Sequence, residues 1–225
     1  MGGTSMRYYP VFLKVEGRPV LVVGGGEVGA RKVETLLRSG ARVGVVSPEL
    51  SPWLQEKVWE GTVEVVGRHY DETQLVGRFL VIAATDDGEL NSRIASDAER
   101  RNLLCNVVDV PREGNFIVPA LVRRGALTLA ISTDGQSPAL ARRIREELEE
   151  CYGEEYGDLL HLLGAVRARL LSTSQDSQAN KGRFEQLVHS PLLELVRLRD
   201  REGVERMLRE VLGEGYSLED LEIFW

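Results

Sequence analysis

The sequence predicts an α/β fold: a doubly wound parallel sheet, then a small strand–strand–helix segment and a helical tail. Three observations lead to this prediction. Five short apolar segments alternate with helical segments over the first half of the 225-residue chain, as in parallel sheets with right-handed crossovers. A glycine-rich turn joins the first strand to the first helix. After residue 111 the alternation stops, and two strands and a run of helices follow.

The composition is that of an ordinary globular protein. Apolar residues make up 43% of the chain, and the formal net charge is −7. This acidic balance argues against a general nucleic-acid binder. No apolar segment approaches the ~20 residues that span a bilayer, and the N-terminus lacks the apolar stretch of a signal peptide. We therefore expect a cytoplasmic protein with no nucleic-acid or membrane partner.

Cysteine and histidine usage indicates no fixed metal site. Cys105 and Cys151 form no C-x-x-C pair, so neither a redox motif nor a zinc knuckle is predicted. Cys105 lies inside an apolar segment and is expected to be a small core residue. The three histidines are far apart in the sequence and show no ligand spacing.

The first half of the chain contains five apolar segments bounded by turn residues. The segment at 79–84 is apolar throughout, as expected for a strand that is covered on both faces. Gly40 is suited to a left-handed C-cap of the first helix. Strands are predicted at 19–23, 41–46, 62–66, 79–84 and 104–108, helices at 27–38, 52–60 and 90–101, and a helical turn at 71–76.

The turn after the first strand matches G-x-G-x-x-G through Gly24, Gly26 and Gly29. The first glycine allows the tight turn, the second lets the backbone approach a pyrophosphate, and the third lets the helix pack on the strand. The N-terminus of that helix then faces the phosphates. With a strand before it and an amphipathic helix after it, the motif predicts a dinucleotide site. The alternative is a glycine turn that binds no ligand.

Polar residues follow three other strands. Because the carboxyl ends of parallel strands meet at one edge, we expect Ser47–Glu49, Thr85–Asp87 and Asp109 to line one crevice with the glycine turn. A ribose-binding carboxylate is expected about 20 residues after the glycines. The second strand ends on Ser47, Glu49 follows, and no arginine or lysine comes next to hold a 2′-phosphate. This pattern favours NAD over NADP.

The second half of the chain is predicted as a strand–strand–helix unit followed by helices. Its helix starts with Ser137 as N-cap and Pro138 at the first helical position, and runs to about Glu150. The unit is too small to hold its own core, so it is expected to pack on the first domain or on a second subunit. Strands are predicted at 115–119 and 127–132, helices at 159–171, 187–199, 203–212 and 217–223, and a polar loop at 172–182.

Four sequence blocks occur in a fixed order. They are GGGEVGARK at 24–32, AATDD at 83–87, CNVVDVP at 105–111 and STDGQSPALAR at 132–142. Together they resemble the precorrin-2 dehydrogenase / sirohydrochlorin ferrochelatase family, which makes sirohaem. The resemblance runs from about residue 9 to 150, and loosely to 171. It implies an NAD-binding Rossmann domain at 1–112, a small α+β dimerisation domain at 113–150 and a C-terminal helical domain at 151–225.

The resemblance also implies an activity and several site residues. Precorrin-2 would lose a hydride to NAD⁺ and become sirohydrochlorin, and some family members also insert Fe²⁺ into that product. Glu27, Val28, Pro48 and Glu49 match cofactor positions of the family, and Asp109 matches its central acid.

Asp109 is the predicted catalytic residue. An aspartate is ionised at neutral pH, so beside a nicotinamide it could accept a proton as the hydride leaves, or hold a pyrrole N–H. In a chelatase it could take protons from the macrocycle or hold Fe²⁺ transiently. The alternative is an aspartate that only ends a strand.

An octacarboxylate such as precorrin-2 requires a local basic region. Residues 112–145 contain six arginines and two acidic residues, and arginine pairs with carboxylates in bidentate fashion. The alternative is a solvated or dimer-contact basic surface. The expected substrate-binding residues are Arg112, Ser132, Thr133, Ser137 and Arg142.

Three functions remain open from the sequence. The first is an NAD-dependent precorrin-2 dehydrogenase that acts as a homodimer. The second is a bifunctional enzyme that also inserts Fe²⁺, and the third is a non-catalytic NAD(H)-sensing module. The third leaves Asp109 and the arginines without a role. The expected cofactor-binding residues are Gly24, Gly26, Glu27, Val28, Gly29, Ser47, Pro48, Glu49, Thr85, Asp86 and Asn106.

Overall fold

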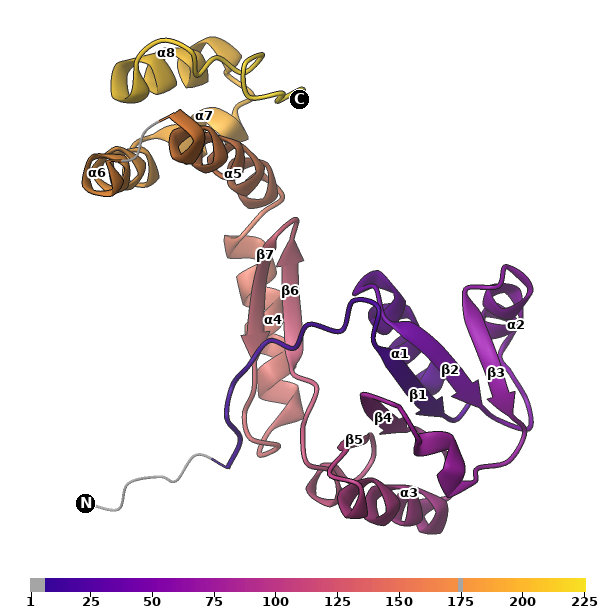
Figure 1. Cartoon of the computed structure of the whole chain (residues 1–225). Helices are drawn as coiled ribbons and strands as arrows, with labels where there is room; N and C mark the ends of the chain where they lie inside the picture. The colour runs from indigo at the N-terminus through magenta and orange to yellow at the C-terminus, as the bar shows by residue number, and fades with distance from the viewer. Residues whose placement is uncertain (1–6, 174–175) are drawn as a thin grey trace. The chain divides into compact units, whose positions relative to one another are not determined.

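A computed structural model describes residues 7–173 and 176–225 of the chain (Figure 1). The chain divides between Val118 and Pro119 into two units. Within the described ranges, no helix combines the length and the apolar character needed to cross a membrane.

The first unit contains a five-stranded parallel sheet with the strand order β3-β2-β1-β4-β5. The chain passes from β1 to β2 and β3, then returns to β4 on the other side of β1. The switch point of the sheet therefore lies between β1 and β4. The elements are β1 (Pro19–Val23), α1 (Glu27–Arg38), β2 (Arg42–Val46), α2 (Pro52–Trp59), β3 (Val63–Gly67), η1 (Glu72–Leu75), β4 (Leu80–Ala83), α3 (Gly88–Arg100), β5 (Leu104–Val107) and η2 (Pro111–Glu113).

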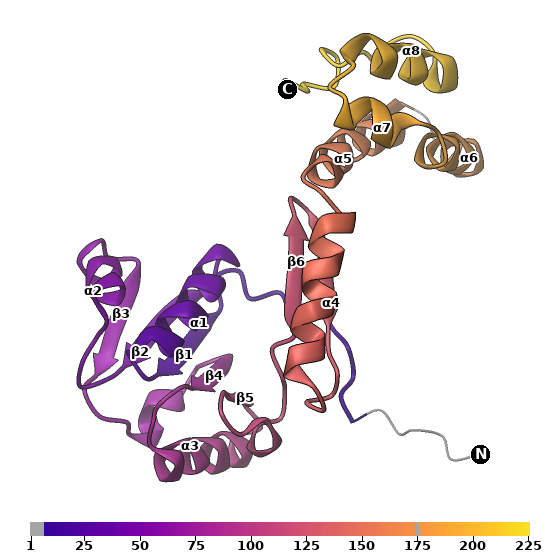
Figure 2. The ribbon, with the colours of Figure 1, turned by 180° about the vertical axis from the view of Figure 1, so that it is seen from behind.

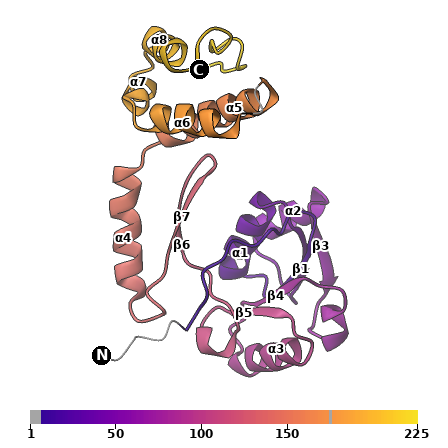
Figure 3. The same ribbon diagram turned by 60° about the vertical axis from the view of Figure 1, so that its left-hand side comes forward.

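Helices cover both faces of this sheet, with α1 and α3 on opposite sides (Figure 3). Val22 of β1 packs in a core with Val33 of α1 and Leu54 of α2. Its neighbour Leu21 points to the other face and packs in a core with Ile94 of α3. Burying one such side chain contributes about 1.5–3 kcal/mol. The five predicted strands and three predicted helices are confirmed, with ends that differ by at most two residues.

The second unit opens with an antiparallel hairpin, β6 (Ala120–Arg124) and β7 (Leu127–Ile131), joined by a two-residue turn. Gly125 takes the first turn position with φ of 55°, a conformation that suits glycine. Helix α4 (Pro138–Cys151) runs along the hairpin (Figure 2) and begins with Ser137 as its N-cap, as predicted. The prediction of a strand at 115–119 is wrong, because those residues precede the hairpin and are held against β5 instead.

Helices α5 (Glu155–Thr173), α6 (Ser177–Val188), α7 (Leu192–Arg197) and α8 (Arg201–Leu212) complete the unit. They share a core of their own, which includes Leu162, Leu187 and Leu208. The predicted helices at 159–171 and 203–212 are confirmed within α5 and α8.

Most of the predicted polar loop at 172–182 is helical, so that prediction is wrong for the residues the structure describes; residues 174–175 lie outside them. Helix α5 extends to Thr173, and α6 starts at Ser177. The Asp176 carboxylate caps α6 by accepting the N–H groups of Gln178 and Ala179. A polar composition here reflects a solvent-facing helix start rather than a loop.

Two predicted helices near the C-terminus are also wrong. The helix at 187–199 is interrupted after Val188, and Pro191 becomes the N-cap of a separate α7, because proline cannot donate within a continuing helix. Residues 217–223 form turns. Ser217 and Asp220 close them through reciprocal bonds between backbone N–H groups and side chains, each 3.0 Å long.

Candidate functional site

The turn between β1 and α1 uses each motif glycine for a different steric reason. Gly24 has φ of 117°, and a Cβ there would overlap the Ala84 carbonyl. A Cβ on Gly29 would overlap the Gly24 carbonyl, so helix and strand pack closely here. Gly26 faces open space, and no side chain among the described residues caps α1. The N–H groups at the start of α1 are thus free to bind an anion.

The loop after β2 is tied to the glycine turn by backbone and serine contacts. The Gly25 N–H donates to Ser47 Oγ at 3.0 Å, and the Ser47 hydroxyl donates to the Glu49 carbonyl at 2.6 Å. The Ser51 N–H donates back to the Gly25 carbonyl at 2.8 Å. Pro48 and Glu49 have exposed side chains. Ser47 therefore holds the loop, and Glu49 presents its carboxylate to solvent at this edge.

The loop after β4 is held by Asn91, whose side chain is buried. The Thr85 hydroxyl donates to Asn91 Oδ1 at 2.7 Å, and Asn91 Nδ2 donates to the Thr85 carbonyl at 3.0 Å. Asp87 caps α3 by accepting the Leu90 N–H. Asp86 is exposed and has no hydrogen-bond or ion-pair partner in the part of the chain that the structure describes.

Asp109 follows β5 at the same edge of the sheet. The Val108 N–H donates to the Ala83 carbonyl at 3.0 Å, so pairing with β4 continues up to the residue before Asp109. Ala83 is also paired with Val23, the last residue before the glycine turn. Asp109 therefore leaves the sheet two strand spacings from that turn, ~10 Å at the usual spacing. Its side chain is exposed.

Asn106 faces into the fold rather than toward this edge. Its side chain is buried, and Nδ2 donates to the Phe116 carbonyl at 3.0 Å. This bond holds the segment that follows the Asp109 loop. A direct contact between Asn106 and a cofactor stays a prediction.

Three of the predicted substrate-binding residues meet in the turn between β7 and α4. The Thr133 hydroxyl donates to the Ser137 carbonyl at 3.0 Å and accepts the Ser137 N–H at 3.2 Å. Ser132 Oγ accepts the Asp134 N–H, and Ser137 Oγ accepts the Leu140 N–H as helix cap. These bonds shape the turn, and contact with a substrate stays a prediction.

The arginines of α4 are paired with glutamates one turn later. Arg142 contacts Glu146 at 2.9 Å, and this bond lowers the pKa of the Glu146 carboxyl. Arg143 is paired in the same way with Glu147. Glu146 and Glu147 directly follow the arginine-rich residues 112–145, so the arginines of α4 form ion pairs. Exposed pairs of this kind are weak because water screens both charges.

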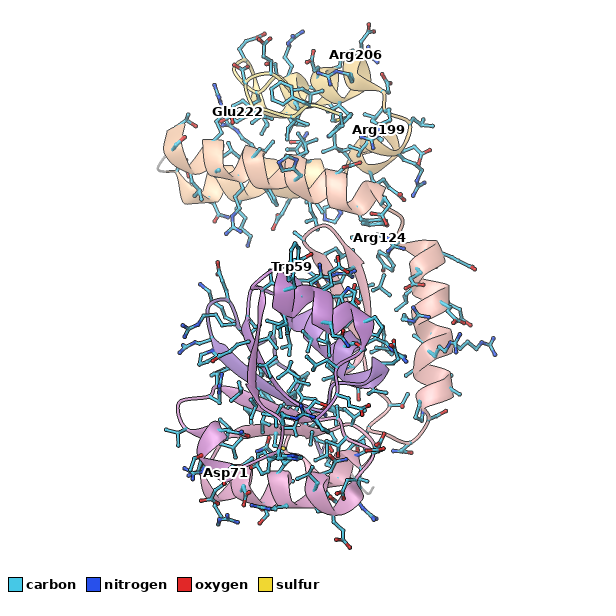
Figure 4. The ribbon with its side chains drawn as sticks, turned by 90° about the vertical axis from the view of Figure 1, so that its right-hand side faces the viewer. Trp59, Asp71, Arg124, Arg199, Arg206 and Glu222 are labelled. Carbon is cyan, nitrogen blue, oxygen red and sulfur yellow. The ribbon has the colours of Figure 1, made fainter. Side chains whose placement is uncertain are left out.

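Arg124 and Arg112 differ from these arginines. Arg124 lies beside the end of α4 (Figure 4) and donates to the carbonyls of Tyr152 and Glu149, so it caps that helix. Arg112 lies in the first unit on η2, exposed and without an ion pair among the described residues. Its neighbour Glu113 accepts the Ser92 hydroxyl at 2.7 Å.

The structure thus places the predicted residues in two groups. The glycine turn, the 47–49 and 85–86 loops, Asp109 and Arg112 belong to the first unit. Ser132, Thr133, Ser137 and Arg142 belong to the second. Among the described residues, no three His, Cys, Asp or Glu side chains are arranged to hold a metal ion.

Sequence reasoning missed four residues that shape the site. Gly25 and Ser51 join two loops, while Asn91 and Asn115 each bond to the backbone of a strand end or loop. The middle glycine of the GGG run was a signal for Gly25, since the motif needs only Gly24 and Gly26 there. Nothing in the local pattern pointed to the other three.

Comparisons with known proteins identify relatives in sirohaem biosynthesis. A family described as "Putative NAD(P)-binding" matches residues 11–120, and one described as "Sirohaem biosynthesis protein central" matches residues 124–150. Siroheme synthase of Methylobacillus flagellatus is 36% identical over 219 residues, which is 97% of this chain and 47% of that protein. Siroheme synthase 1 of Serratia proteamaculans is 44% identical over 165 residues, 73% of this chain and 35% of that protein.

Among solved structures, "SirC, precorrin-2 dehydrogenase" matches with a TM-score of 0.74 and 30% sequence identity. The match covers 91% of this chain and 98% of that structure. The chain spans less than half the length of the two siroheme synthases, but nearly the whole of the solved structure.

Proposed function

We propose that this chain, which belongs to the precorrin-2 dehydrogenase family of sirohaem biosynthesis, oxidises precorrin-2 to sirohydrochlorin with NAD⁺. In this reaction the substrate gives a hydride to NAD⁺ and a proton to a base. The observation that carries the proposal is the position of Asp109 at the same sheet edge as the glycine turn. The family match to an NAD(P)-binding domain supports the cofactor.

The first unit fits a dinucleotide. Gly26 leaves the space a pyrophosphate needs, and the uncapped N-terminus of α1 supplies N–H donors. The exposed carboxylate of Glu49 follows β2, where a carboxylate can accept from the ribose hydroxyls and would repel a 2′-phosphate. NAD⁺ bound there supplies the hydride acceptor, and these residues orient it.

Asp109 is the proton acceptor in this proposal. Its exposed carboxylate has no hydrogen bond or ion pair with any other described residue, so it is accessible to a substrate. The same property supports a second candidate function, insertion of Fe²⁺ into sirohydrochlorin, in which Asp109 takes the protons that leave the macrocycle. Arg112, Arg142 and the hydroxyls of the 132–137 turn are proposed to bind the substrate carboxylates.

The proposal includes a homodimer formed through the hairpin and α4. Of the apolar residues in these three elements, only Val122 and Ala141 are buried, while Leu140 is 49% exposed. The hairpin and α4 bury so few residues that they gain stability by packing on another surface. Light scattering at micromolar concentration is expected to give the mass of two chains, and a monomer would contradict the dimer.

The activity is tested by anaerobic incubation with precorrin-2 and NAD⁺, followed by NADH absorbance and the tetrapyrrole spectrum. Asp109→Asn is expected to lower kcat at least about 100-fold, the usual contribution of a general base, with NAD⁺ affinity unchanged. Glu99→Gln makes the same change on an exposed residue of α3 and is expected to stay fully active. Binding of NAD⁺ without turnover by the wild type would overturn the proposal. Fe²⁺ added to sirohydrochlorin tests chelation separately.

A further inference from the structure

The loop that carries Asp109 is closed at its base against the strand from which it leaves. It spans residues 108–113 and returns at Gly114 to the backbone of β5. A Cβ at Gly114 would lie only 2.6 Å from the Cys105 carbonyl oxygen, so the two backbones are in close contact. β5 is an edge strand of the sheet, and the returning chain covers that edge.

The side-chain amide of Asn115 pairs with β5 as a neighbouring strand would. Asn115 Oδ1 accepts the Cys105 N–H at 2.8 Å, and Nδ2 donates to the Leu103 carbonyl at 2.9 Å. The Asn115 N–H also donates to the Cys105 carbonyl at 2.9 Å. One residue thus satisfies three backbone groups at the outer edge of β5, groups that need partners when water is excluded.

A second asparagine, on β5 itself, holds the segment that follows the loop. Asn106 of β5 is 4% exposed, and its Nδ2 donates to the Phe116 carbonyl at 3.0 Å. Phe116 in turn packs against the core shared with α1 and α2. A third hydrogen bond, the third tie of this loop, joins the loop to α3, where Glu113 accepts the Ser92 hydroxyl. The backbone on both sides of Asp109 is therefore held by side chains outside the nucleotide loops.

We infer that Asn115 is a positioning residue for Asp109, with Asn106 as its partner; this inference rests on the proposed function, which makes Asp109 the proton acceptor. Asp109 has no bond from its own carboxylate to another described residue, so only its backbone sets the direction of the carboxylate. The glycine turn and the 47–51 loop are tied to each other by Ser47 and Gly25. Loosening the base of the Asp109 loop should therefore impair proton transfer and spare NAD⁺ binding.

The main test is Asn115→Asp, which keeps the size of the side chain and replaces the donor facing the Leu103 carbonyl with an acceptor. The expected result is a 10- to 100-fold fall in kcat, the range caused by small misplacement of a catalytic group, with the KM for NAD⁺ within twofold of wild type. Asn102→Asp makes the same replacement on an exposed asparagine at the end of α3, and should leave kcat unchanged. Unaltered kcat in Asn115→Asp would overturn the inference.

A double variant separates positioning from a general loss of structure. If Asn115 acts through Asp109, Asn115→Asp combined with Asp109→Asn should be no slower than Asp109→Asn alone, because the two effects are not additive. A full additive loss would show that Asn115 acts independently of Asp109. If Asn115→Asp fails to fold, Ser92→Ala removes the third tie from an exposed site, and kcat should fall with NAD⁺ affinity retained.

Hydrogen exchange tests the inference apart from the reaction. In Asn115→Asp, amides at 108–113 should exchange at least tenfold faster than in wild type, while those of β1 and α1 should not change. Unchanged exchange at 108–113 would reject the positioning role even in an active enzyme. A further outcome is that the wild type does not oxidise precorrin-2, while Asn115→Asp still exchanges faster at 108–113. This outcome would reject the proposed function, but it would support the role of Asn115 in holding the loop.

Discussion

Ser47 Oγ accepts the Gly25 N–H at 3.0 Å, which joins the loop after β2 to the glycine turn after β1. The same hydroxyl donates to the Glu49 carbonyl at 2.6 Å. One side chain thus sets the distance between the proposed pyrophosphate and ribose ends of the nucleotide site. The two loops are expected to move together when the cofactor binds.

Removal of this hydroxyl should weaken NAD⁺ binding. Ser47→Ala leaves the Gly25 N–H and the Glu49 carbonyl without their partner, at a cost of about 1–3 kcal/mol. The expected result is a 5- to 100-fold higher Kd for NAD⁺ by calorimetry. Ser39→Ala, at the end of α1, is the matched control and should bind NAD⁺ as the wild type does. Equal affinity in Ser47→Ala would show that the loops do not depend on this bond.

A methyl group at Gly29 should disrupt both the fold and the site. The Cβ of Gly29→Ala would overlap the Gly24 carbonyl, and overpacking of this kind costs about 1–3 kcal/mol. We expect Tm to fall by about 2–12 °C for a chain of this size, with loss of NAD⁺ binding. Gly88→Ala enters open space at the first position of α3. Its Tm should stay the same or rise.

The two cysteines should differ sharply in reactivity. Cys105 is buried, and burial raises the pKa of its thiol to about 11, so little thiolate forms at pH 8. Cys151 is exposed. A disulfide reagent such as Ellman's is therefore expected to modify one thiol in the native protein and two after denaturation. Rapid reaction of both thiols in the native protein would show that the β5 region opens easily.

Tyr70 should make stability depend on alkaline pH. Burial and the hydrogen bond to Asp97 raise the pKa of its hydroxyl well above the ordinary value. In the folded chain the hydroxyl stays protonated at a pH where it ionises in the unfolded chain. The raised pKa of Tyr70 contributes to the free energy of unfolding below about pH 10, the ordinary pKa of tyrosine. This contribution is lost as the pH rises above that value. Denaturant unfolding should show that the free energy of unfolding falls more between pH 8 and pH 10.5 for the wild type than for Tyr70→Phe.

Much of the first unit follows from local patterns. The strand around Val22 and Leu21 is apolar at every position because helices cover both faces of the sheet. The glycine motif identifies the turn because Gly24 and Gly29 occupy positions where any side chain would collide. The Gly29–Gly24 contact lies within one short turn, and an apolar strand is recognisable from its own residue types, so both features appear directly in the amino-acid pattern.

One error arose because the partner of a segment lies elsewhere in the chain. Residues 115–119 look like a strand, but Asn115 bonds to β5 through its side chain and the hairpin starts at Ala120. For Asn115 the residue type was evident from the sequence, while the backbone groups of β5 that it contacts were not. The arginines of α4 are a different case: Arg142 pairs with Glu146 only four residues later, so this ion pair is local and the helical spacing of the two residues indicates it.

Residue types and their spacing predicted the α/β fold and the glycine turn, which the structure confirms, and they singled out Asp109 as the proposed proton acceptor. How these parts are held is visible only in the folded chain, because Ser47, Asn91 and Asn115 bond to groups 22, 6 and 10–12 positions away. A pattern of residue types records which side chains can form hydrogen bonds. It does not record which distant backbone group each one meets, since that depends on how the strands and loops are brought together.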